Sequence, residues 1–327
     1  MHGWACDNVE AFEVALANGS IVTASPTEHA DLYRALRGGG PICGIVTDFT
    51  LRTFPYSGMW GGQLVHDYSE SDRVLQEYIR YGQSSEQDPK FSIILNFGGR
   101  DGAWYYANDI QYCAPLDNAR DVEMIKPWLR IPSVKDTTGT VHHQSAHTVN
   151  LATRTPSGWR NSFWALSTKL DFGIAKFFVE IFVAESERLA AHVPDLHCAF
   201  DLQVITTGML RDTVERNGSN NALGLSPADG PLLLYNPVPR WSDRAHDTAV
   251  YRAMETVINK TAQRARELGV ENDFLYMNYA SQFQDAVSSY GDDNVRFLRA
   301  VSQKYDPAGT FSRLQGGRFS SMGRCRD

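Results

Sequence analysis

The sequence predicts an α+β protein in which helices cover one face of a β-sheet. In the middle of the chain, strand-like runs with alternating or clustered apolar residues are interleaved with runs whose apolar residues recur at helical spacing. The chain has 327 residues, 43% of them hydrophobic, which suffices for one large domain or two smaller ones with a substantial core. A sheet layered against helices is the usual way to bury such a pattern.

A β-hairpin is expected near the start of the chain. Apolar residues alternate with polar or small ones over residues 8–16, and Ile21-Val22-Thr23 reads as the returning strand. Asn18-Gly19 lies between them and predicts a type I′ turn, in which both residues have positive φ.

A helix, a glycine loop and a strand are expected next. The helix spans residues 27–37 and ends at Gly38-Gly39-Gly40, and residues 42–54 read as a buried strand. Glycines at this point let the backbone approach a ligand that side chains would block.

The middle region, roughly residues 60–270, alternates strands with helices and contains no internal repeat. The expected strands are residues 63–65, 91–97, 104–113, 163–170 and 199–206. The expected helices are residues 71–81, 118–129, 175–190 and 245–268.

The last region, residues 273–327, is expected to begin with an aromatic strand, Phe274-Leu275-Tyr276. A helix over residues 292–305 follows and stops at Asp306-Pro307. The basic tail, residues 318–327, is expected to fray.

Composition argues against several kinds of partner. The formal charge is −7 and the 31 Lys and Arg residues are scattered, so neither nucleic acid nor an anionic membrane is expected as a partner. No run approaches the roughly 18 apolar residues that span a bilayer. No signal peptide opens the chain. Sequons at Asn18, Asn217 and Asn259 are compatible with secretion from a longer N-terminus, so the localisation stays open, as does the oligomeric state.

Metal and disulfide sites are not expected. The five cysteines are widely spaced without a C-x-x-C motif, which favours free thiols. His143 and His147 share a helical spacing within His142-His143-Gln144-Ser145-Ala146-His147, but this segment lacks an acidic third ligand.

Several segments, in order along nearly the whole chain, resemble the berberine-bridge-enzyme-like family of FAD-linked oxidoreductases. They are Gly3-Trp4-Ala5-Cys6-Asp7-Asn8-Val9, Asp31-Leu32-Tyr33-Arg34-Ala35-Leu36-Arg37-Gly38-Gly39-Gly40, Gly44-Ile45-Val46-Thr47, Tyr276-Met277-Asn278-Tyr279-Ala280, Tyr290-Gly291 and Lys304-Tyr305-Asp306-Pro307. Arg160-Asn161-Ser162-Phe163 and Asn221-Ala222-Leu223-Gly224-Leu225 are similar to short patterns of the family's substrate domain.

The resemblance implies three parts. Residues 1–58 correspond to the C-terminal half of a FAD-binding domain of the PCMH type, which has the vanillyl-alcohol-oxidase-like fold. Residues 59–270 correspond to a substrate-binding domain with an antiparallel sheet covered by helices, and residues 271–327 to a berberine-like segment that completes the flavin lobe. In the family, FAD lies between the flavin lobe and the C-terminal segment, and the substrate enters over the sheet. The family's upstream subdomain, with its diphosphate loop and flavin-tethering histidine, has no counterpart in this chain, so the flavin lobe is expected to be incomplete.

The resemblance also implies cofactor contacts. Gly40, Gly44, Ile45 and Val46 are expected to offer backbone groups to FAD. Asn278 is expected to offer its amide donor and acceptor to the flavin.

A tyrosine of the C-terminal segment is the implied base for hydride transfer to flavin N5, and Tyr276 and Tyr279 are both candidates. A phenol has a pKa of about 10, so it acts as a base near neutrality only where a cation or a hydrogen-bond donor lowers that pKa. In a strand Tyr276 and Asn278 would share one face and Tyr279 would lie on the other, so only a bend would bring all three to one ligand.

Two functions are consistent with these residues. The first is a FAD-linked oxidase or dehydrogenase for a secondary metabolite or a carbohydrate-type substrate, present here as a truncated form. The second is a flavin-independent pseudo-oxidase that binds or rearranges a small molecule in the former substrate cleft. The first predicts exposed apolar surface on the hairpin and on Gly44-Ile45-Val46, whereas the second predicts that these faces are covered or polar. A stacking surface for the substrate is expected from Trp104, Tyr105, Tyr106, Trp159 and Trp164.

Overall fold

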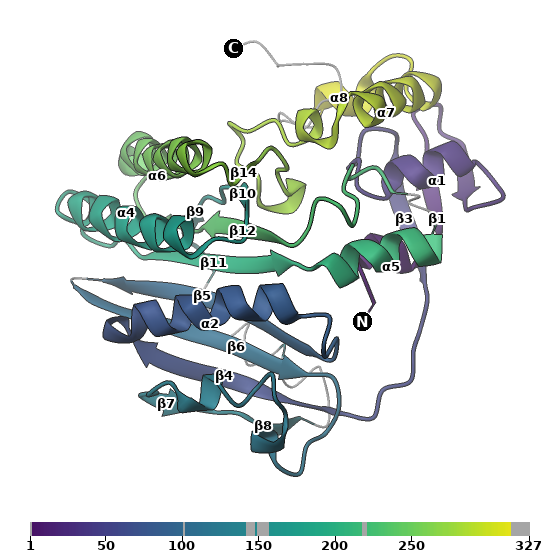
Figure 1. Ribbon diagram of the computed structural model, residues 1–327. Helices are drawn as coiled ribbons and strands as arrows, with labels where there is room; N and C mark the ends of the chain where they lie inside the picture. Colours follow the sequence, from purple (N-terminus) through teal and green to yellow (C-terminus); the bar gives the residue numbers. More distant parts are fainter. Residues whose placement is uncertain (1, 101, 142–147, 149–156, 218–220, 315–327) are drawn as a thin grey trace. The chain divides into compact units, whose positions relative to one another are not determined.

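The computed structural model describes residues 2–100, 102–141, 148, 157–217 and 221–314 (Figure 1). The chain forms two compact units. Unit 1 comprises Met1–Pro55, Thr207–Gly230 and Asp273–Asp327, and unit 2 comprises Tyr56–Thr206 and Pro231–Asn272. The segment Thr207–Gly230, expected within the substrate domain, is therefore part of unit 1. The predicted α+β class is confirmed.

Unit 1 is built on a small antiparallel sheet. Its strands are β1 (Val9–Ala15), β2 (Ile21–Ala24) and β3 (Ile45–Leu51), in the order β2-β1-β3. Val14 pairs with Val22 on one side and Val46 on the other. Val9, Phe12 and Val14 of the central strand are buried, and a register shift between Val9 and Ala11 interrupts the alternation.

The hairpin turn differs from the expected type. Gly19 has φ +83°, but Asn18 is not among the residues with positive φ, so the turn is not type I′. The Leu16 N–H donates to Ser20 O and the Gly19 N–H donates to Leu16 O. These bonds define a three-residue loop with glycine at the left-handed position, which is the next most common hairpin connection.

Strand β3 corrects a second expectation, because it is not buried. Ile45 is 59% exposed and Phe49 is 55% exposed. The β-branched and aromatic residues predict a strand here, but the apolar run does not reveal which face has a partner. Of the apolar surface expected to be exposed on the hairpin and at residues 44–46, Ile21 and Ile45 are exposed, whereas Gly44 is buried and Val46 is half-buried.

Unit 1 also contains four helices in its described residues. They are α1 (Ala30–Leu36), α5 (Thr207–Asn217), α7 (Asp292–Tyr305) and α8 (Thr310–Leu314), with 3-10 turns η1 (Ala5–Asn8), η6 (Met277–Tyr279) and η7 (Val287–Tyr290). Helix α1 begins three residues later than expected because Ser25 and Glu28 form a turn between their backbone groups. Helix α7 has the bounds that the sequence predicts.

The strand expected at Phe274-Leu275-Tyr276 is absent from the described secondary structure. Its backbone instead leads into turn η6, with Ala280 N donating to Tyr276 O over 3.0 Å. Aromatic residues suggested a strand, but the local hydrogen bonds close a tight turn.

Unit 2 contains a large antiparallel sheet, nine-stranded within the described residues. Its strand order is β14-β10-β12-β11-β5-β6-β4-β7, and β8 also pairs with β4. The strands are β4 (Met59–Asp67), β5 (Phe91–Arg100), β6 (Ala103–Tyr112), β7 (Lys135–Asp136), β8 (Gly139–Val141), β10 (Leu166–Lys169), β11 (Cys198–Ile205), β12 (Leu232–Pro237) and β14 (Glu271–Asn272). A separate ribbon pairs β9 (Arg160–Asn161) with β13 (Arg240–Trp241).

Helices α2 (Ser71–Ser84) and α4 (Phe172–Ala190) pack against one face of this sheet, and α6 (Asp247–Leu268) contacts α4. Phe178 of α4 makes an edge contact with Phe200 at 4.8 Å, and the Tyr78 hydroxyl of α2 donates to Leu202 O. The predicted layer of sheet and helices is thus confirmed.

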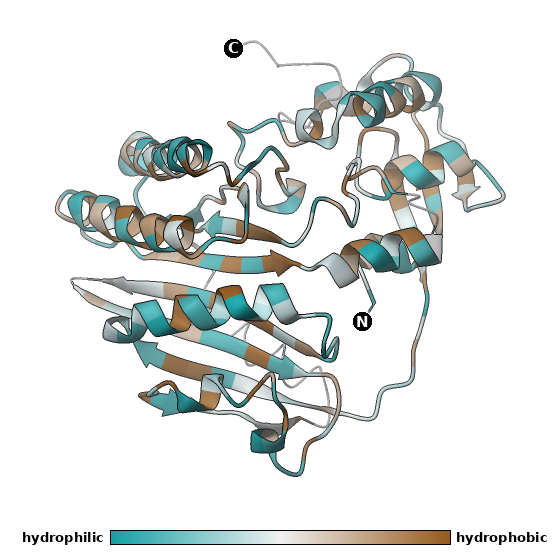
Figure 2. Ribbon diagram, in the orientation of Figure 1, coloured by the Kyte–Doolittle hydropathy of each residue, from teal (hydrophilic) through white to brown (hydrophobic). Residues whose placement is uncertain are grey.

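Two elements of unit 2 depart from the sequence pattern. Residues 118–129 form 3-10 turns η3 (Ala119–Asp121) and η4 (Trp128–Arg130) instead of a helix, because Val122 is extended and Pro127 lacks an N–H. Strand β12 was not expected, because it is buried at every position and shows no alternation. Its hydrophobic run is visible in Figure 2.

Candidate functional site

Unit 1 contains a cavity of about 350 Å³, near the lower end of the range of about 300–1,000 Å³ for small-molecule sites. Segments far apart in the sequence meet around it. Its lining residues are Trp4, Ala5, Cys6, Val9, Phe12, Leu36, Gly38, Gly40, Phe49, Leu51, Leu223, Tyr276, Met277, Asn278 and Tyr290.

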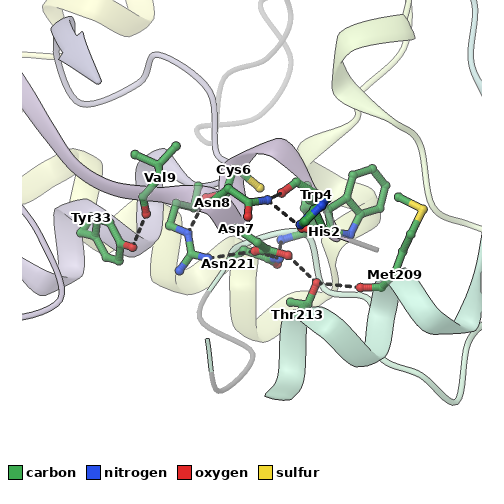
Figure 3. A network of polar contacts seen from close by, with 12 residues as sticks. His2, Trp4, Cys6, Asp7, Asn8, Val9, Tyr33, Met209, Thr213 and Asn221 are labelled. Atoms are coloured by element: carbon green, nitrogen blue, oxygen red, sulfur yellow. Dashed lines mark hydrogen bonds and ion pairs between the residues drawn. The ribbon is translucent and has the colours of Figure 1, made fainter. Parts of the chain in front are cut away.

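A buried polar network fixes one wall of this cavity (Figure 3). Arg37 Nη2 lies 2.9 Å from Asp7 Oδ1, and both side chains are almost fully buried. Asn221 Nδ2 donates to the same oxygen over 3.0 Å, and the Thr213 hydroxyl donates to Asp7 Oδ2. Arg37 Nε donates to Cys6 O over 2.8 Å. The network therefore joins η1, α1, α5 and the loop at Asn221.

The start of the chain is anchored beside this network. Asn8 Nδ2 donates to His2 O over 2.7 Å and to Trp4 O over 2.8 Å. The Asn8 side chain thus organises the approach to β1 and holds Trp4 in the cavity wall. The Trp4 ring lies 5.5 Å from the Tyr276 ring.

Two glycines of the loop after α1 pack closely against other parts of unit 1. Gly38 has φ +113°, and a Cβ there would lie 2.8 Å from Leu223 Cδ2. Gly40 has φ +73°, and a Cβ there would lie 2.9 Å from Met277 Sδ. Positive φ and close packing both favour glycine at these positions.

Tyr276 and Asn278, at turn η6, both line the cavity. Asn278 Nδ2 donates to the Tyr276 hydroxyl over 2.9 Å. The Tyr279 ring meets the Tyr276 ring edge-on at 5.0 Å, but Tyr279 is not among the lining residues.

The electrostatic setting of Tyr276 leaves its phenol protonated near neutral pH. Burial raises the pKa of Tyr276, Tyr279 raises it further, and the hydrogen bond from Asn278 lowers it without reversing the shift. No lysine, arginine or histidine is among the cavity's described lining residues. The cation that would make Tyr276 a base is therefore not supplied by this wall.

The Cys6 thiol also lines the cavity. Burial, followed by the nearby Asp7 carboxylate, raises the pKa of the Cys6 thiol to about 12. A neutral thiol of this kind is not a reactive nucleophile. Cys6, Cys43, Cys113 and Cys198 are free, as expected.

The other expected cofactor contacts lie outside this cavity. A Cβ on Gly44 would lie 2.6 Å from Val14 Cγ1, so glycine there allows β3 to pack on β1. Ile45 is exposed and Val46 pairs with Val14. The structure therefore brings together Gly40 and Asn278, while Gly44, Ile45 and Val46 remain predicted contacts.

Sequence reasoning did not single out Tyr290 or Leu223 as site residues. Both belong to segments that resemble the family, but their place in the cavity depends on contacts between distant parts of the chain. The signal available in the sequence was the glycine beside each of them, Gly291 and Gly224, which both have positive φ.

Unit 2 has a row of polar side chains on one face of its sheet, opposite the face that packs against helices α2 and α4. Asn236 Nδ2 donates to Asp201 Oδ2 over 3.3 Å, and Asn96 Nδ2 donates to Asp109 Oδ2 over 3.0 Å. Gln63 Nε2 lies 3.5 Å from Asp109 Oδ1. Burial, with a contribution from Asp109, raises the pKa of Asp201 to about 6, although the hydrogen bond from Asn236 lowers it.

The expectation that these aromatic residues form a stacking surface is largely wrong. Trp104, Tyr106 and Trp164 are buried in the core of unit 2. Tyr105 is exposed on the opposite face of its strand, and Trp159 is partly exposed. Alternation along β6 assigns neighbouring aromatics to opposite faces.

The described residues contain no cluster of His, Cys, Asp and Glu arranged to hold a metal. The segment His142-His143-Gln144-Ser145-Ala146-His147 lies outside the described residues. Among the helices in the described ranges, none is long and apolar enough to cross a membrane.

Comparison with known proteins agrees with this fold. No protein-family model matches the chain. The FAD-dependent monooxygenase tpcD of Cochliobolus heterostrophus is 32% identical over 336 residues, covering 97% of this chain and 62% of the relative. The FAD-dependent monooxygenase FUP4 of Fusarium proliferatum is 32% identical, with the same coverage of 97% and 62%. The chain thus spans about three fifths of the length of these relatives.

Solved structures share the fold at low identity. The 6-hydroxy-D-nicotine oxidase of Arthrobacter nicotinovorans matches with a TM-score of 0.72 and 17% identity, covering 97% of this chain and 66% of that one. The xylooligosaccharide oxidase of Myceliophthora thermophila matches with a TM-score of 0.68 and 18% identity, covering 93% and 65%.

The chain therefore shares its fold with solved oxidases of this kind. It is similar in sequence to FAD-dependent monooxygenases and in fold to solved proteins described as berberine-bridge-enzyme-like and of the vanillyl-alcohol-oxidase type.

Proposed function

We propose that this chain is part of a FAD-linked oxidoreductase in which the cavity of unit 1 receives the isoalloxazine ring system of FAD. The observation that carries the proposal is the convergence of Gly40, Tyr276 and Asn278 on one apolar, aromatic cavity. FAD, when bound, supplies hydride acceptance from a substrate carbon. In the chain itself, Trp4 and the tyrosines would contact the ring faces, and Asn278 would orient a polar edge.

The residues present fit the ring system better than the diphosphate. The lining is largely apolar, and its polar side chains include Asn278, Tyr276, Tyr290 and Cys6. Burial raises the pKa of the Tyr276 and Tyr290 phenols and of the Cys6 thiol, so all three are neutral near pH 7. A diphosphate requires cations or a cluster of backbone donors, and no cation lines the described cavity. We therefore propose that this cavity binds the uncharged ring portion.

The exposure of strand β3 is an argument that a further segment covers it in the working enzyme. Phe49 and Leu51 line the cavity on one side and are more than half exposed. An apolar face of this kind marks an interaction surface. We propose that a flavin-binding segment, on the same or a separate chain, covers this face and supplies the diphosphate site.

The substrate is proposed to contact the polar row of unit 2. The amides of Asn96 and Asn236 and the carboxyls of Asp109 and Asp201 offer both donors and acceptors on one face of the sheet. Such an array suits a hydroxylated secondary metabolite or a carbohydrate-type molecule. Proteins of this fold include, by name, oxidases of xylooligosaccharide and of 6-hydroxy-D-nicotine.

The proposed reaction is oxidation of such a substrate. Monooxygenation is the alternative reaction, because the relatives are described as FAD-dependent monooxygenases. Asp201 is the candidate proton acceptor of the row, because its raised pKa of about 6 places its titration near neutrality. Tyr276 is the candidate hydrogen-bond donor, since its phenol stays protonated.

The second candidate function is a flavin-independent protein that binds or rearranges a small molecule. The absence of cations among the described cavity residues favours it. A titration of the purified chain with riboflavin, FMN and FAD, followed by flavin fluorescence, separates the two. If the cavity binds the ring system, the dissociation constants of the three ligands agree within about threefold. If none of them binds, the flavin-independent function is favoured.

A further inference from the structure

We propose that Tyr290 is a further hydrogen-bond donor of the unit 1 cavity, and that its hydroxyl donates to a carbonyl oxygen or ring nitrogen of the bound flavin ring. The inference rests on the proposed function and deepens it. It assigns a binding role to a residue outside the Tyr276–Asn278 turn.

The first observation is an unpaired hydroxyl. Tyr290 is 2% exposed and lines the cavity, yet its hydroxyl has no hydrogen-bond partner among the described residues. A buried hydroxyl without a partner costs roughly 1–3 kcal/mol, so native proteins rarely keep one without a reason. Phenylalanine would fill the same space without that cost.

The second observation is that the ring is held in place by other groups. It stacks on Phe274, with the ring centroids 6.0 Å apart and 20° between the planes. Asn294 Nδ2 donates to Tyr290 O over 3.0 Å, and the absence of a side chain on Gly224 lets that carbonyl approach closely. The packing of this residue therefore does not depend on its hydroxyl, which is free to serve a ligand.

The third observation is the charge state of the surrounding groups. Burial raises the pKa of Tyr290 well above its ordinary value, and the neighbouring Tyr276 and Cys6 add to this shift. Tyr290 is therefore a neutral donor near pH 7. The Tyr276 hydroxyl has a partner, because it accepts a hydrogen bond from Asn278, whereas the buried Tyr290 hydroxyl has none among the described residues.

These observations specify the ligand class. A neutral, unpaired donor in an apolar aromatic cavity recognises a planar, uncharged ring that carries an acceptor atom. The flavin ring system has such acceptors in its carbonyl oxygens and unprotonated ring nitrogens. An anionic group would meet no cation among the described lining residues.

The test is Tyr290→Phe in the full chain, with riboflavin and FAD as probes. Two quantities are measured: the dissociation constant by flavin fluorescence, and the free energy of unfolding of the ligand-free protein in urea. We expect the dissociation constant to rise about tenfold or more, because the donor is lost. We expect the ligand-free protein to be unchanged or stabilised, because an unpaired polar group is removed. Loss of binding without loss of stability is a signature that a structural tyrosine would not give.

The matched control is Tyr78→Phe in unit 2. Tyr78 is also fully buried, but its hydroxyl donates to Leu202 O. This variant is expected to lose stability and to keep the wild-type flavin affinity. Tyr290→Phe should therefore lower the flavin affinity but not the stability, whereas Tyr78→Phe should lower the stability but not the flavin affinity.

Two results would overturn the assignment while leaving the proposed function intact. One is equal flavin affinity of the wild type and Tyr290→Phe. The other is a loss of stability in Tyr290→Phe as large as in Tyr78→Phe, which would mean that the hydroxyl has a structural partner. A wild-type chain that binds neither riboflavin nor FAD overturns the proposed function itself, and the assignment of Tyr290 with it.

Discussion

A Cβ atom on Gly40 would lie 2.9 Å from Met277 Sδ, so the loop after α1 and turn η6 approach as closely as a glycine permits. The two residues are far apart in the sequence and together form part of one cavity wall. The size of the cavity therefore depends on the absence of a side chain at residue 40.

Replacement of Gly40 by alanine is expected to weaken flavin binding about tenfold, because the new methyl group pushes Met277 within the cavity wall. The positive φ of Gly40 adds a stability cost of roughly 1 kcal/mol. Flavin titration and urea unfolding measure the two effects. Gly19→Ala is the control, because Gly19 has φ +83° but nothing within 4 Å of its added Cβ. It should lose similar stability and keep its flavin affinity, and equal flavin affinity in both variants would contradict this account of the wall.

The Asp7–Arg37 pair is expected to be a major contributor to the stability of unit 1. Arg37→Met leaves the Asp7 carboxylate buried without its cation, which costs about 3–5 kcal/mol of unfolding free energy. Arg52→Met is the control, because the Arg52–Glu10 pair on the same unit is about half exposed. That variant should change stability by less than about 1 kcal/mol. Similar losses for both variants in urea unfolding would show that the network in Figure 3 is not structural.

How far the sequence predicts this fold depends on whether a signal is local. Helix α7 is predicted with its bounds because its apolar stripe and the Asp306-Pro307 stop lie within one short segment. Strand β12 is missed because complete burial removes the alternation that identifies a strand. The predicted burial of β3 fails for a related reason, since an apolar strand looks the same whether or not its face is covered.

The candidate site shows the same limit. Tyr276 and Asn278 are found from a short motif, but they lie at a turn where the aromatic residues suggested a strand. Tyr290 becomes a site residue only through its place beside segments that are distant in the sequence. The Asp7–Arg37 pair joins residues that no local pattern connects.

Asp201 is expected to make unit 2 less stable as the pH rises. Its pKa of about 6 in the folded chain lies above the value of about 3.9 for an exposed aspartate, so the native state binds the proton more tightly than the unfolded state. Its stabilising effect is therefore present in acid and lost as the pH rises from about 4 through 6. Asp201→Asn should raise the unfolding free energy at pH 7.5 by up to about 3 kcal/mol and leave it similar at pH 4.

Urea unfolding of both proteins at several pH values tests this expectation. Asp48→Asn, which changes an exposed aspartate, serves as the control and should show the pH dependence of the wild type. If Asp201→Asn also keeps the wild-type pH dependence, the aspartate does not titrate as proposed.

The exposed face of β3 is expected to promote self-association of the isolated chain. Ile45→Thr keeps a β-branched side chain on the strand but removes apolar surface, so it should reduce association and change stability by less than about 0.5 kcal/mol. Sedimentation velocity measures the association. Val14→Thr on the buried side of the same sheet should instead destabilise the fold. Unchanged self-association of the Ile45→Thr variant would mean that the exposed face of β3 does not mediate it.

Hydrogen–deuterium exchange of the full chain with and without saturating FAD tests the central claim most directly. If the cavity of unit 1 binds the flavin ring, exchange slows in residues 3–9, 38–40 and 276–280 and around Tyr290, where the lining segments lie. Protection confined to unit 2, or no protection although FAD is bound, would contradict a flavin site in this cavity.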